Sequence, residues 1–289
     1  MLSVSKKQFL LWVKKQLLKG GNKSSLYLLL DLIADISLNQ LCLIKVNKEG
    51  NLYLKKNLEF IESMWDDHIR RSIPIQYLCG FTYWRDMKLM VSDKVLIPRP
   101  ETELIVDIVH EIIERNNQKL FFAELGTGSG AVSIALSILN SSWKGIATDI
   151  DKDAIDIAYK NYKNCSNQSN LTFCCGDWWK PIENLKGELD LVISNPPYIP
   201  KDNYEKLPKE VKDFEPKIAL FGGEDGLDHI REIIHLAPLY LRDNGWLIIE
   251  NHFDQGTKVK ELYLENNFKS VNVLKDLSGI GRFTIGRYK

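Results

Sequence analysis

The tetrapeptide Asn195-Pro196-Pro197-Tyr198 carries the clearest chemical signal in this sequence. Its prolines fix φ and remove backbone donors, so the segment is a stiff loop that presents carbonyl oxygens, one amide side chain and one aromatic ring. The side-chain oxygen of Asn195 and the carbonyl oxygen of Pro196 can accept both hydrogens of a neutral NH₂ group on a planar π system, and Tyr198 can stack on its flat face. The tetrapeptide therefore predicts a site for an amide-type or ring amino nitrogen.

A nitrogen of that kind is a weak nucleophile because its lone pair is delocalised into the neighbouring carbonyl group or ring. Acceptors that hold both of its hydrogens orient the lone pair and increase its electron density. A group transfer to it then depends on alignment and electrostatics, and a strong general base is not needed. The alternative interpretation of residues 195–198 is a proline turn without chemistry.

A second candidate site is the glycine-rich run Gly126-Thr127-Gly128-Ser129-Gly130. The apolar residues 120–123 before it predict a buried strand, and residues 131–139 after it predict a helix. Glycines let the backbone turn sharply and approach a ligand closely at the positive end of the following helix. This order of strand, glycine turn and helix predicts a binding site for a nucleotide-like cofactor.

Two residues further along complete this predicted cofactor site. Asp149 ends the next predicted strand, about 20 residues after the glycines, where a carboxylate can accept both hydrogen bonds of a ribose diol. The arrangement suits NAD and S-adenosylmethionine equally, and a helix cap is the alternative role for Asp149. Trp178 follows the third predicted strand, so we expect it to contact an adenine ring, whereas its neighbour Trp179 suits burial under the sheet edge almost as well.

The elements that position these residues are those of a doubly wound α/β fold. From Glu101 onward, helical stretches alternate with short β-branched runs, which is typical of a mostly parallel sheet with helices on both faces. The predicted strands lie near residues 120–124, 145–149, 171–174, 189–194, 245–250, 269–274 and 282–287.

The N-terminal part has a different pattern, in which apolar residues such as Phe9 and Val13 recur at helical spacing. We predict a small helical bundle over residues 1–75, which we expect to recognise the substrate. A β-hairpin linker follows over residues 76–100, and the catalytic, cofactor-binding domain is predicted over residues 101–289.

The composition indicates a folded protein without a strong electrostatic preference. Hydrophobic residues make up 44% of the 289 residues, and the 38 basic residues balance the 38 acidic ones. No stable nucleic-acid binding is therefore expected. The five cysteines contain no C-x-x-C pair and the five histidines lack metal-ligand spacing, so no metal is predicted. The first apolar run ends at Lys14, too early for a membrane span, which with the unpaired thiols predicts a cytoplasmic protein.

The chain resembles one known family, the release factor glutamine methyltransferases, over most of its length. The resemblance is carried, in order, by IQYLCG at 75–80, VLIPRPETE at 95–103, ELGTGSG at 124–130, NPPY at 195–198, GEDGL at 223–227 and DLSGIGR at 276–282. The N-terminal bundle resembles that of the family in character only. One departure is His252, where the family usually has glycine, and we expect this residue to lie away from the site.

The resemblance implies a class I methyltransferase fold with seven strands, a helical N-terminal domain and a connecting β-hairpin. It also implies transfer of a methyl group from S-adenosylmethionine to the side-chain amide nitrogen (N5) of the glutamine in the Gly-Gly-Gln motif of class I peptide chain release factors. Carried over by position, Gly126 to Gly130, Asp149, Trp178 and Asn195 would contact the cofactor. The loop from Asn195 to Tyr198 would hold the glutamine amide.

Three other functions are compatible with parts of the sequence. An adenine-N6 methyltransferase for DNA or RNA uses a similar tetrapeptide on a similar NH₂ group, but the neutral charge and the lack of an evident basic domain for base flipping disfavour it. An NAD-dependent oxidoreductase and a non-catalytic cofactor-binding module are also compatible with the glycine loop. Neither explains Asn195 to Tyr198.

Overall fold

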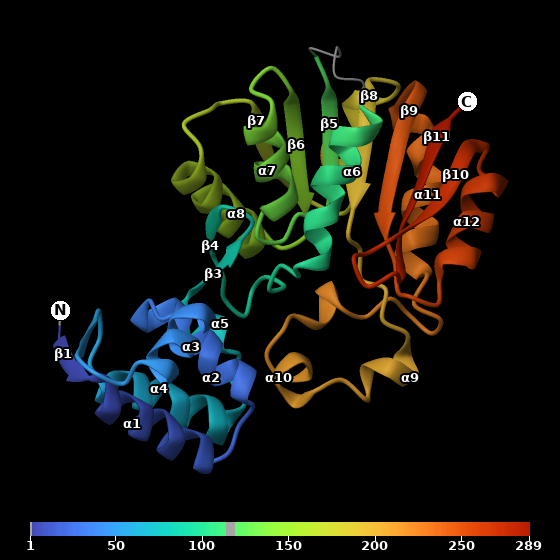
Figure 1. Cartoon of the computed structure of the whole chain (residues 1–289). Helices are drawn as coiled ribbons and strands as arrows, with labels where there is room; N and C mark the ends of the chain where they lie inside the picture. The colour runs from blue at the N-terminus through green and yellow to red at the C-terminus, as the bar shows by residue number, and fades with distance from the viewer. Residues whose placement is uncertain (1, 114–118) are drawn as a thin grey trace. The chain divides into compact units, whose positions relative to one another are not determined.

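The computed structural model describes residues 2–113 and 119–289, and the chain forms two compact units. The first unit comprises Met1–Thr82 together with Lys209–Phe214, and the second comprises Tyr83–Pro208 together with Glu215–Lys289 (Figure 1). Both predicted site segments, the glycine loop and the tetrapeptide, belong to the second unit.

The first unit is a helical bundle around its own apolar core, as the N-terminal pattern predicts. Phe9, Leu26 and Trp65 are fully buried in this core. A capping box between Ser5 and Gln8 starts the first helix. The helices are α1 (Lys6–Leu18), α2 (Lys23–Leu29), the π-helical turn η1 (Leu30–Ala34), α3 (Leu38–Val46), α4 (Leu58–Arg71), α5 (Ile75–Cys79) and α10 (Lys209–Lys212). The sequence patterns did not predict α3 or the antiparallel pair β1 (Leu2–Ser5) and β2 (Asn51–Leu54).

Helices α2 and α3 are apolar, which raises the question of whether they could span a membrane. Within residues 2–113 and 119–289, no single helix is long and apolar enough to span a bilayer. Taken together, the helical segments Lys23–Ala34 and Leu38–Val46 are long and apolar enough to span a bilayer, but the chain bends by 98° between them. Several apolar side chains of this pair, among them Leu29, Leu30 and Leu41, are buried in the core of the first unit.

The second unit contains the predicted doubly wound sheet. Its strands are β5 (Phe121–Leu125), β6 (Lys144–Asp149), β7 (Leu171–Cys175), β8 (Leu189–Ser194), β9 (Leu241–Glu250), β10 (Phe268–Lys275) and β11 (Gly281–Tyr288). They form one seven-stranded sheet in the order β10-β11-β9-β8-β5-β6-β7. Neighbours from β9 to β7 are parallel, and β11 is antiparallel to both of its neighbours. All seven predicted strands and the predicted mostly parallel sheet are confirmed.

Helices cover both faces of this sheet (Figure 1). Apolar side chains of α6 (Leu104–Ile112), α7 (Ala131–Leu139) and α8 (Lys152–Cys165) form one core layer with strand residues such as Phe122. Those of α11 (Asp228–Tyr240) and α12 (Gly256–Glu265) form the other, with strand residues such as Leu125. Shorter elements are η2 (Glu101–Glu103), η3 (Lys180–Leu185), α9 (Lys201–Tyr204) and η4 (Lys217–Ala219).

The predicted hairpin is present as β3 (Phe81–Trp84) and β4 (Met87–Met90), and one buried side chain anchors its second strand. Asn161 on α8 is fully buried, accepts from the Met90 N–H at 2.7 Å and donates to the Met90 carbonyl at 3.0 Å. Its amide also donates to the carbonyl of Ser129 in the glycine loop at 2.9 Å. One side chain thus holds β4 and the glycine loop to the same helix.

Replacing Asn161 with alanine should therefore destabilise the second unit. Backbone groups of Met90 and Ser129 would lose their partners, and such losses in partly buried sites cost roughly 1–3 kcal/mol of unfolding free energy. Urea denaturation measures the change. The control is Lys160→Ala at an exposed position of α8, for which a change within about 0.5 kcal/mol is expected. Equal stabilities of the two variants would contradict the anchoring role.

Candidate active site

The two predicted site segments begin at the ends of neighbouring strands. Strands β5 and β8 pair in parallel with Leu125 opposite Ser194, and the Ser194 hydroxyl donates to the Leu125 carbonyl at 2.8 Å. Gly126 and Asn195 are the next residues of the two strands. In the sheet, β6 and β7 follow β5 on one side, and β8 lies on its other side, so the strand order reverses between β5 and β8. Open α/β sheets bind ligands at such a switch point.

The glycine loop adopts a backbone conformation that requires glycine. Gly126, Gly128 and Gly130 have φ values of 73°, 54° and 82°, in the left-handed region. A Cβ on Gly130 would also lie 2.9 Å from the side chain of Ile134 and 3.1 Å from that of Ala158. The loop therefore comes close to its supporting helices and exposes backbone groups toward the cavity.

Asp149, the last residue of β6, holds the loop from the other side. Its carboxylate accepts from the Gly128 N–H at 2.8 Å and from the Asp151 N–H at 3.0 Å, and burial raises its pKa. The N-cap of α8 is Asp151, whose carboxylate accepts from the Asp153 N–H, so Asp149 does not serve as the helix cap. The carboxylate of Asp149 lies beside the glycine loop, on the wall of the cavity.

The adjacent tryptophans have different surroundings. Trp178 has a left-handed φ of 41°, lines the cavity and lies so close to Gly126 that a Cβ there would be 3.2 Å from its ring. Its ring centroid is 5.5 Å from that of His229. Trp179 is only 3% exposed and stacks on Tyr240 in the core below the sheet. Of the two, only Trp178 faces the candidate site.

A buried carboxylate that sequence reasoning did not assign supports the glycine loop. Glu124 is 4% exposed, and its Oε2 accepts from the Thr127 hydroxyl at 2.6 Å and from the Ser133 N–H at 3.1 Å. Burial raises its pKa to about 7 against the opposing effect of these hydrogen bonds. An acidic residue immediately before a glycine loop was the available signal, since a carboxylate there can accept from the first turn of the helix.

The tetrapeptide is held mainly through its two polar side chains. The Asn195 amide donates from Nδ2 to the hydroxyl of Thr102 at 3.2 Å, and the Tyr198 hydroxyl donates to the carboxylate of Glu250 at 3.2 Å. Pro196 and Pro197 are buried. The carbonyl of Tyr198 accepts from Gln255 Nε2 at 3.0 Å, which fixes the end of the loop.

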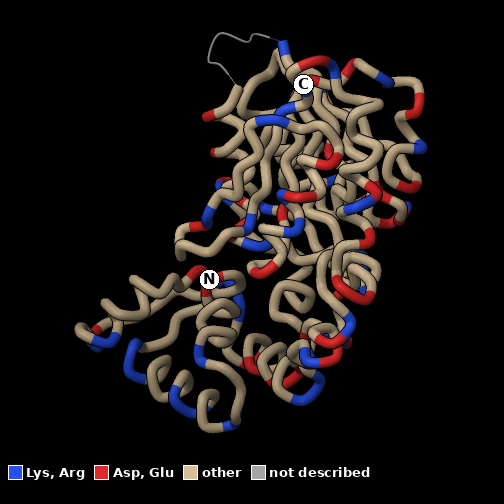
Figure 2. Tube along the Cα trace, turned by 90° about the vertical axis from the view of Figure 1, so that its right-hand side faces the viewer, with Lys and Arg blue, Asp and Glu red and all other residues tan. Residues whose placement is uncertain are grey.

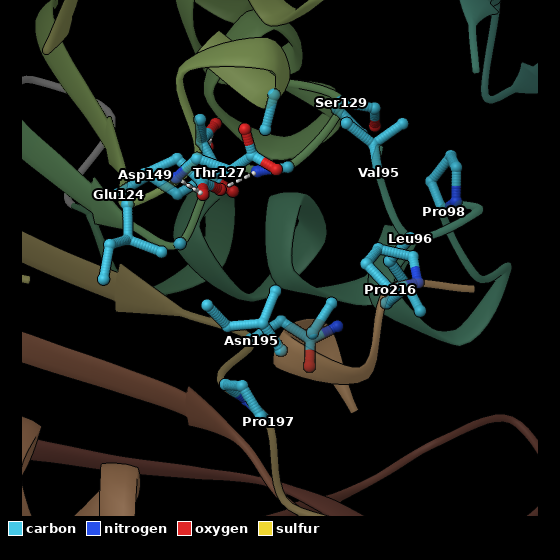
Figure 3. A pocket seen from close by; sticks show the side chains of 18 of the residues that line it. Val95, Leu96, Pro98, Glu124, Thr127, Ser129, Asp149, Asn195, Pro197 and Pro216 are labelled. Carbon is cyan, nitrogen blue, oxygen red and sulfur yellow. Dashed lines mark hydrogen bonds between the residues drawn. The ribbon is translucent and has the colours of Figure 1, made fainter. Parts of the chain in front are cut away.

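Most of the predicted site residues line one cavity. Figure 3 shows Asn195 and Pro197 on one side of it, and Thr127 and Asp149 on another. The predicted residues that line the cavity are Gly126, Thr127, Gly128, Ser129, Asp149, Trp178, Asn195 and Pro197. Gly130, Pro196 and Tyr198 lie outside its lining. Among residues 2–113 and 119–289 no cluster of His, Cys, Asp and Glu has the arrangement of a metal site.

Two segments that carried no predicted site residue also line the cavity. They lie within residues 94–99 and 216–219, and Figure 3 shows Val95, Pro98 and Pro216 together on the right of the view. Arg99 joins the two segments through an ion pair of 2.6 Å to Glu215, which is 4% exposed. The sequence could not reveal this pairing because the partners are 116 residues apart.

His252 lies nearer to the site than the sequence suggested. Its ring centroid is 6.2 Å from that of Tyr198 and 4.3 Å from that of the exposed Phe253. His252 does not line the cavity, as expected, but its ring lies close to Tyr198 at the end of the tetrapeptide, which was not expected. The cause is that β9 runs parallel to β8, so the residues that follow the two strands emerge side by side.

The fold and the site define a class I methyltransferase. The open sheet with one antiparallel strand, the glycine loop after β5 and the Asn-Pro-Pro-Tyr loop after β8 together form its architecture. The sequence model described as the methyltransferase small domain matches residues 102–208. A methyltransferase from Pyrococcus furiosus shares the fold, with a TM-score of 0.52 and 20% identity over 70% of this chain and 89% of that chain.

Curated relatives identify the family more narrowly. The release factor glutamine methyltransferase of Prochlorococcus marinus is 38% identical over 280 residues, which are 96% of this chain and 96% of the relative. That of Thermosynechococcus vestitus is 37% identical over 82% of this chain and 81% of the relative. The chain belongs to the release factor glutamine methyltransferase family, which confirms the resemblance described above.

The raised pKa of Glu124 predicts a specific dependence of stability on pH. The carboxyl titrates at about 7 in the folded protein against an ordinary value of 4.5, so the folded state binds more protons than the unfolded state between these values. The free energy of unfolding should then fall as the pH rises through this window. Glu124→Gln, whose amide oxygen can still accept from Thr127 and Ser133, should be more stable than the wild type at pH 8 by roughly 1–3 kcal/mol.

Urea denaturation at pH 5 and pH 8 measures this difference. Glu261→Gln, at an exposed position of α12, is the matched control and should leave the pH dependence unchanged. A Glu124→Gln protein with the wild-type pH dependence would show that the buried carboxyl does not titrate in this window.

Proposed function

We propose that this protein transfers a methyl group from S-adenosylmethionine to the N5 amide nitrogen of the glutamine in the Gly-Gly-Gln motif of class I peptide chain release factors. The observation that carries the proposal is the single cavity in which Asn195 lies beside the glycine loop, at the ends of the paired strands β5 and β8. The names of the relatives support the release factor as substrate. A role in translation termination and a cytoplasmic location follow from that substrate.

The residues around the glycine loop fit the proposed cofactor. The carboxylate of Asp149 lies where a ribose diol would donate to it, and the ring of Trp178 borders the same cavity, where it would contact adenine. Gly126 to Gly130 would offer backbone groups to the remainder of the molecule. When bound, S-adenosylmethionine supplies a methyl group on a positively charged sulfur that leaves as a neutral thioether.

The residues of the tetrapeptide would bind and orient the acceptor amide. Asn195 Oδ1 and the carbonyl oxygen of Pro196 would accept its two N–H groups, and buried Pro197 would exclude water beside it. Tyr198 lies outside the lining of the cavity, and with its hydroxyl bound to Glu250 it would act on the amide by fixing the shape of the loop. These groups align the nitrogen lone pair with the methyl donor, and alignment supplies much of the rate in such reactions.

We further propose that residues 1–75 recognise the protein substrate, that residues 76–100 link the two parts and that residues 101–289 carry out catalysis. Support comes from the location of the cavity, whose lining belongs entirely to the second unit. The cofactor and the acceptor amide therefore need no residue of the first unit, which remains available for binding the rest of the release factor.

The main alternative, an adenine-N6 methyltransferase, is less well supported. Lys and Arg are interspersed with Asp and Glu over most of the described chain (Figure 2), although the six charged residues before Asp31 are all lysines, and the net charge is zero. Enzymes that extrude a base from nucleic acid need a positively charged surface that holds the phosphate backbone. The balance of charge thus favours a protein substrate.

The proposal is tested by offering isotope-labelled S-adenosylmethionine with three acceptors in parallel: a class I release factor, duplex DNA and RNA. We expect label only in the release factor, and in a variant of that factor whose motif glutamine is replaced we expect none. Mass spectrometry of the digested product locates the methyl group. Label in nucleic acid, or equal label in the glutamine variant, would contradict the proposal.

Asn195→Ala should reduce the rate of methyl transfer far more than it reduces cofactor binding. The change removes an oriented acceptor from a water-poor site, for which losses on the order of 10²–10³ in rate are typical. Asn195→Asp should retain part of the activity because a carboxylate still accepts an N–H, although desolvation of its charge is costly. Single-turnover transfer measures the rate, and thermal melts control for folding. Near wild-type transfer by both folded variants would mean that Asn195 only shapes the turn.

A further inference from the structure

A chain of three hydrogen bonds runs from the tetrapeptide to a buried carboxylate. Asn195 Nδ2 donates to Thr102 Oγ1 at 3.2 Å, and the Thr102 hydroxyl donates to Glu250 Oε2 at 2.8 Å. The other oxygen of the same carboxylate, Oε1, accepts from the Tyr198 hydroxyl at 3.2 Å. Glu250 is 1% exposed and Thr102 is 5% exposed, so water does not compete for these groups. Both polar side chains of the tetrapeptide are thus connected to Glu250.

The chemistry of these groups fixes the direction of the chain. An ionised carboxylate can only accept hydrogen bonds, so the single hydroxyl hydrogen of Thr102 points to Glu250. The Thr102 oxygen can then only accept from Asn195, which requires the NH₂ end of that amide to face Thr102. With the amide reversed, two oxygens without a hydrogen between them would face each other.

This direction decides which end of Asn195 is presented to a ligand. Asn195 and Thr102 both line the cavity, whereas Glu250 lies behind them. With Nδ2 engaged by Thr102, the oxygen Oδ1 is directed away from Thr102. An acceptor amide nitrogen carries hydrogens that need an oxygen partner, so the orientation set by Glu250 is the productive one for the proposed reaction.

We propose that Glu250, acting through Thr102, is a positioning residue that fixes the side-chain amide of Asn195 with its oxygen available to the nitrogen that receives the methyl group. This inference rests on the proposed function, because it assigns a role within the same site. Glu250 does not touch the substrate, and its contribution is the orientation of a side chain that does.

The charged and titratable groups around Glu250 make this orientation sensitive to pH. Burial, together with the charge of Glu101 in η2, raises the pKa of Glu250, whereas the hydrogen bonds from Thr102 and Tyr198 and the charge of Arg282 on β11 lower it, and the net pKa is about 7. A protonated carboxyl can donate as well as accept, so it no longer fixes the hydroxyl hydrogen of Thr102. The orientation of Asn195 is therefore secured at neutral to alkaline pH and is lost as the pH falls below about 7.

The variants that test this role are Glu250→Gln, Thr102→Val and Thr102→Ser, with Asn195→Ala as the reference. Glu250→Gln keeps the shape but can present either its oxygen or its NH₂ group to Thr102, so it no longer fixes the direction of the hydrogen bonds. Thr102→Val keeps the shape but removes the hydroxyl. Both variants should slow single-turnover methyl transfer by about tenfold to a hundredfold. This loss does not exceed the loss of about 10²–10³ in rate that follows removal of one oriented hydrogen-bonding group from an active site. Thr102→Ser, which retains the hydroxyl, should stay within a few-fold of the wild type. Cofactor affinity should change by no more than a few-fold in any of them.

A double-mutant cycle separates positioning from a merely structural role. Once Asn195 is alanine there is no amide to orient, so Glu250→Gln/Asn195→Ala should be no slower than Asn195→Ala alone. A double variant whose loss in rate equals the product of the losses in the two single variants would overturn the proposal, because it would show that Glu250 acts independently of Asn195. If Glu250→Gln does not fold, the same cycle with Thr102→Val decides the question.

The pH dependence of the transfer rate gives a second readout. Because the wild type and Glu250→Gln both contain Glu124, its effect cancels in the ratio of their rates. The ratio of the wild-type rate to the Glu250→Gln rate should be largest near pH 8 and should approach one near pH 5.5, where the wild-type carboxyl is also neutral. A ratio that does not vary with pH would overturn the proposal. The outcomes also separate the two levels of inference. If Asn195→Ala loses its rate while Glu250→Gln and Thr102→Val do not, only this inference fails. If Asn195→Ala keeps its rate, the role proposed for Asn195 fails with it. The proposed function itself fails only if the wild-type protein does not methylate the release factor.

Discussion

The parallel pairing of β5 with β8 is the interaction on which the rest of the site depends. Leu125 opposite Ser194 brings the ends of the two strands to the same level, so the glycine loop and the tetrapeptide start side by side although they are 69 residues apart. Strand pairing has a side-chain period of two, so a slip of one residue would move Ser194 and its neighbours to the opposite face. Helices pack on both faces of the sheet and bury the apolar side chains of its strands. This packing fixes the register of β5 and β8 and therefore the relative positions of the two loops.

The same edge of the sheet also carries two buried carboxylates, and each controls one of the loops. Glu124 near the end of β5 fixes the first turn of the glycine loop, and Glu250 at the end of β9 fixes the polar side chains of the tetrapeptide. Both are almost fully buried, and burial raises the pKa of each to about 7. Buried ionisable groups cost stability, so their position beside a cavity is more readily explained by the orientation that they impose than by a contribution to folding.

The sequence predicted what local chemistry determines and missed what depends on distant partners. The strands, the glycine loop and the tetrapeptide follow from contiguous patterns, and the parallel order of the strands brings them together. Thr102 and Glu250 could not be predicted as partners of Asn195 and Tyr198, because the pairs are 93 and 52 residues apart and no local pattern encodes them. The sequence did favour Trp178 over its neighbour, and only Trp178 lines the cavity, but the left-handed backbone at Trp178 could not be predicted.

The proposed orientation of the Asn195 amide would explain how an acceptor nitrogen is held but not which molecule carries it. An adenine amino group and a glutamine amide present the same pair of hydrogens to Asn195 and Pro196, so the tetrapeptide alone cannot distinguish them. Discrimination must therefore come from other residues that line the cavity, where the atoms beyond the nitrogen would lie. Among them are residues of the segments 94–99 and 216–219, which the ion pair between Arg99 and the buried carboxylate of Glu215 joins. Because this ion pair fixes the two segments to each other, we expect the shape of this part of the lining to decide between a glutamine side chain and a larger base with its sugar.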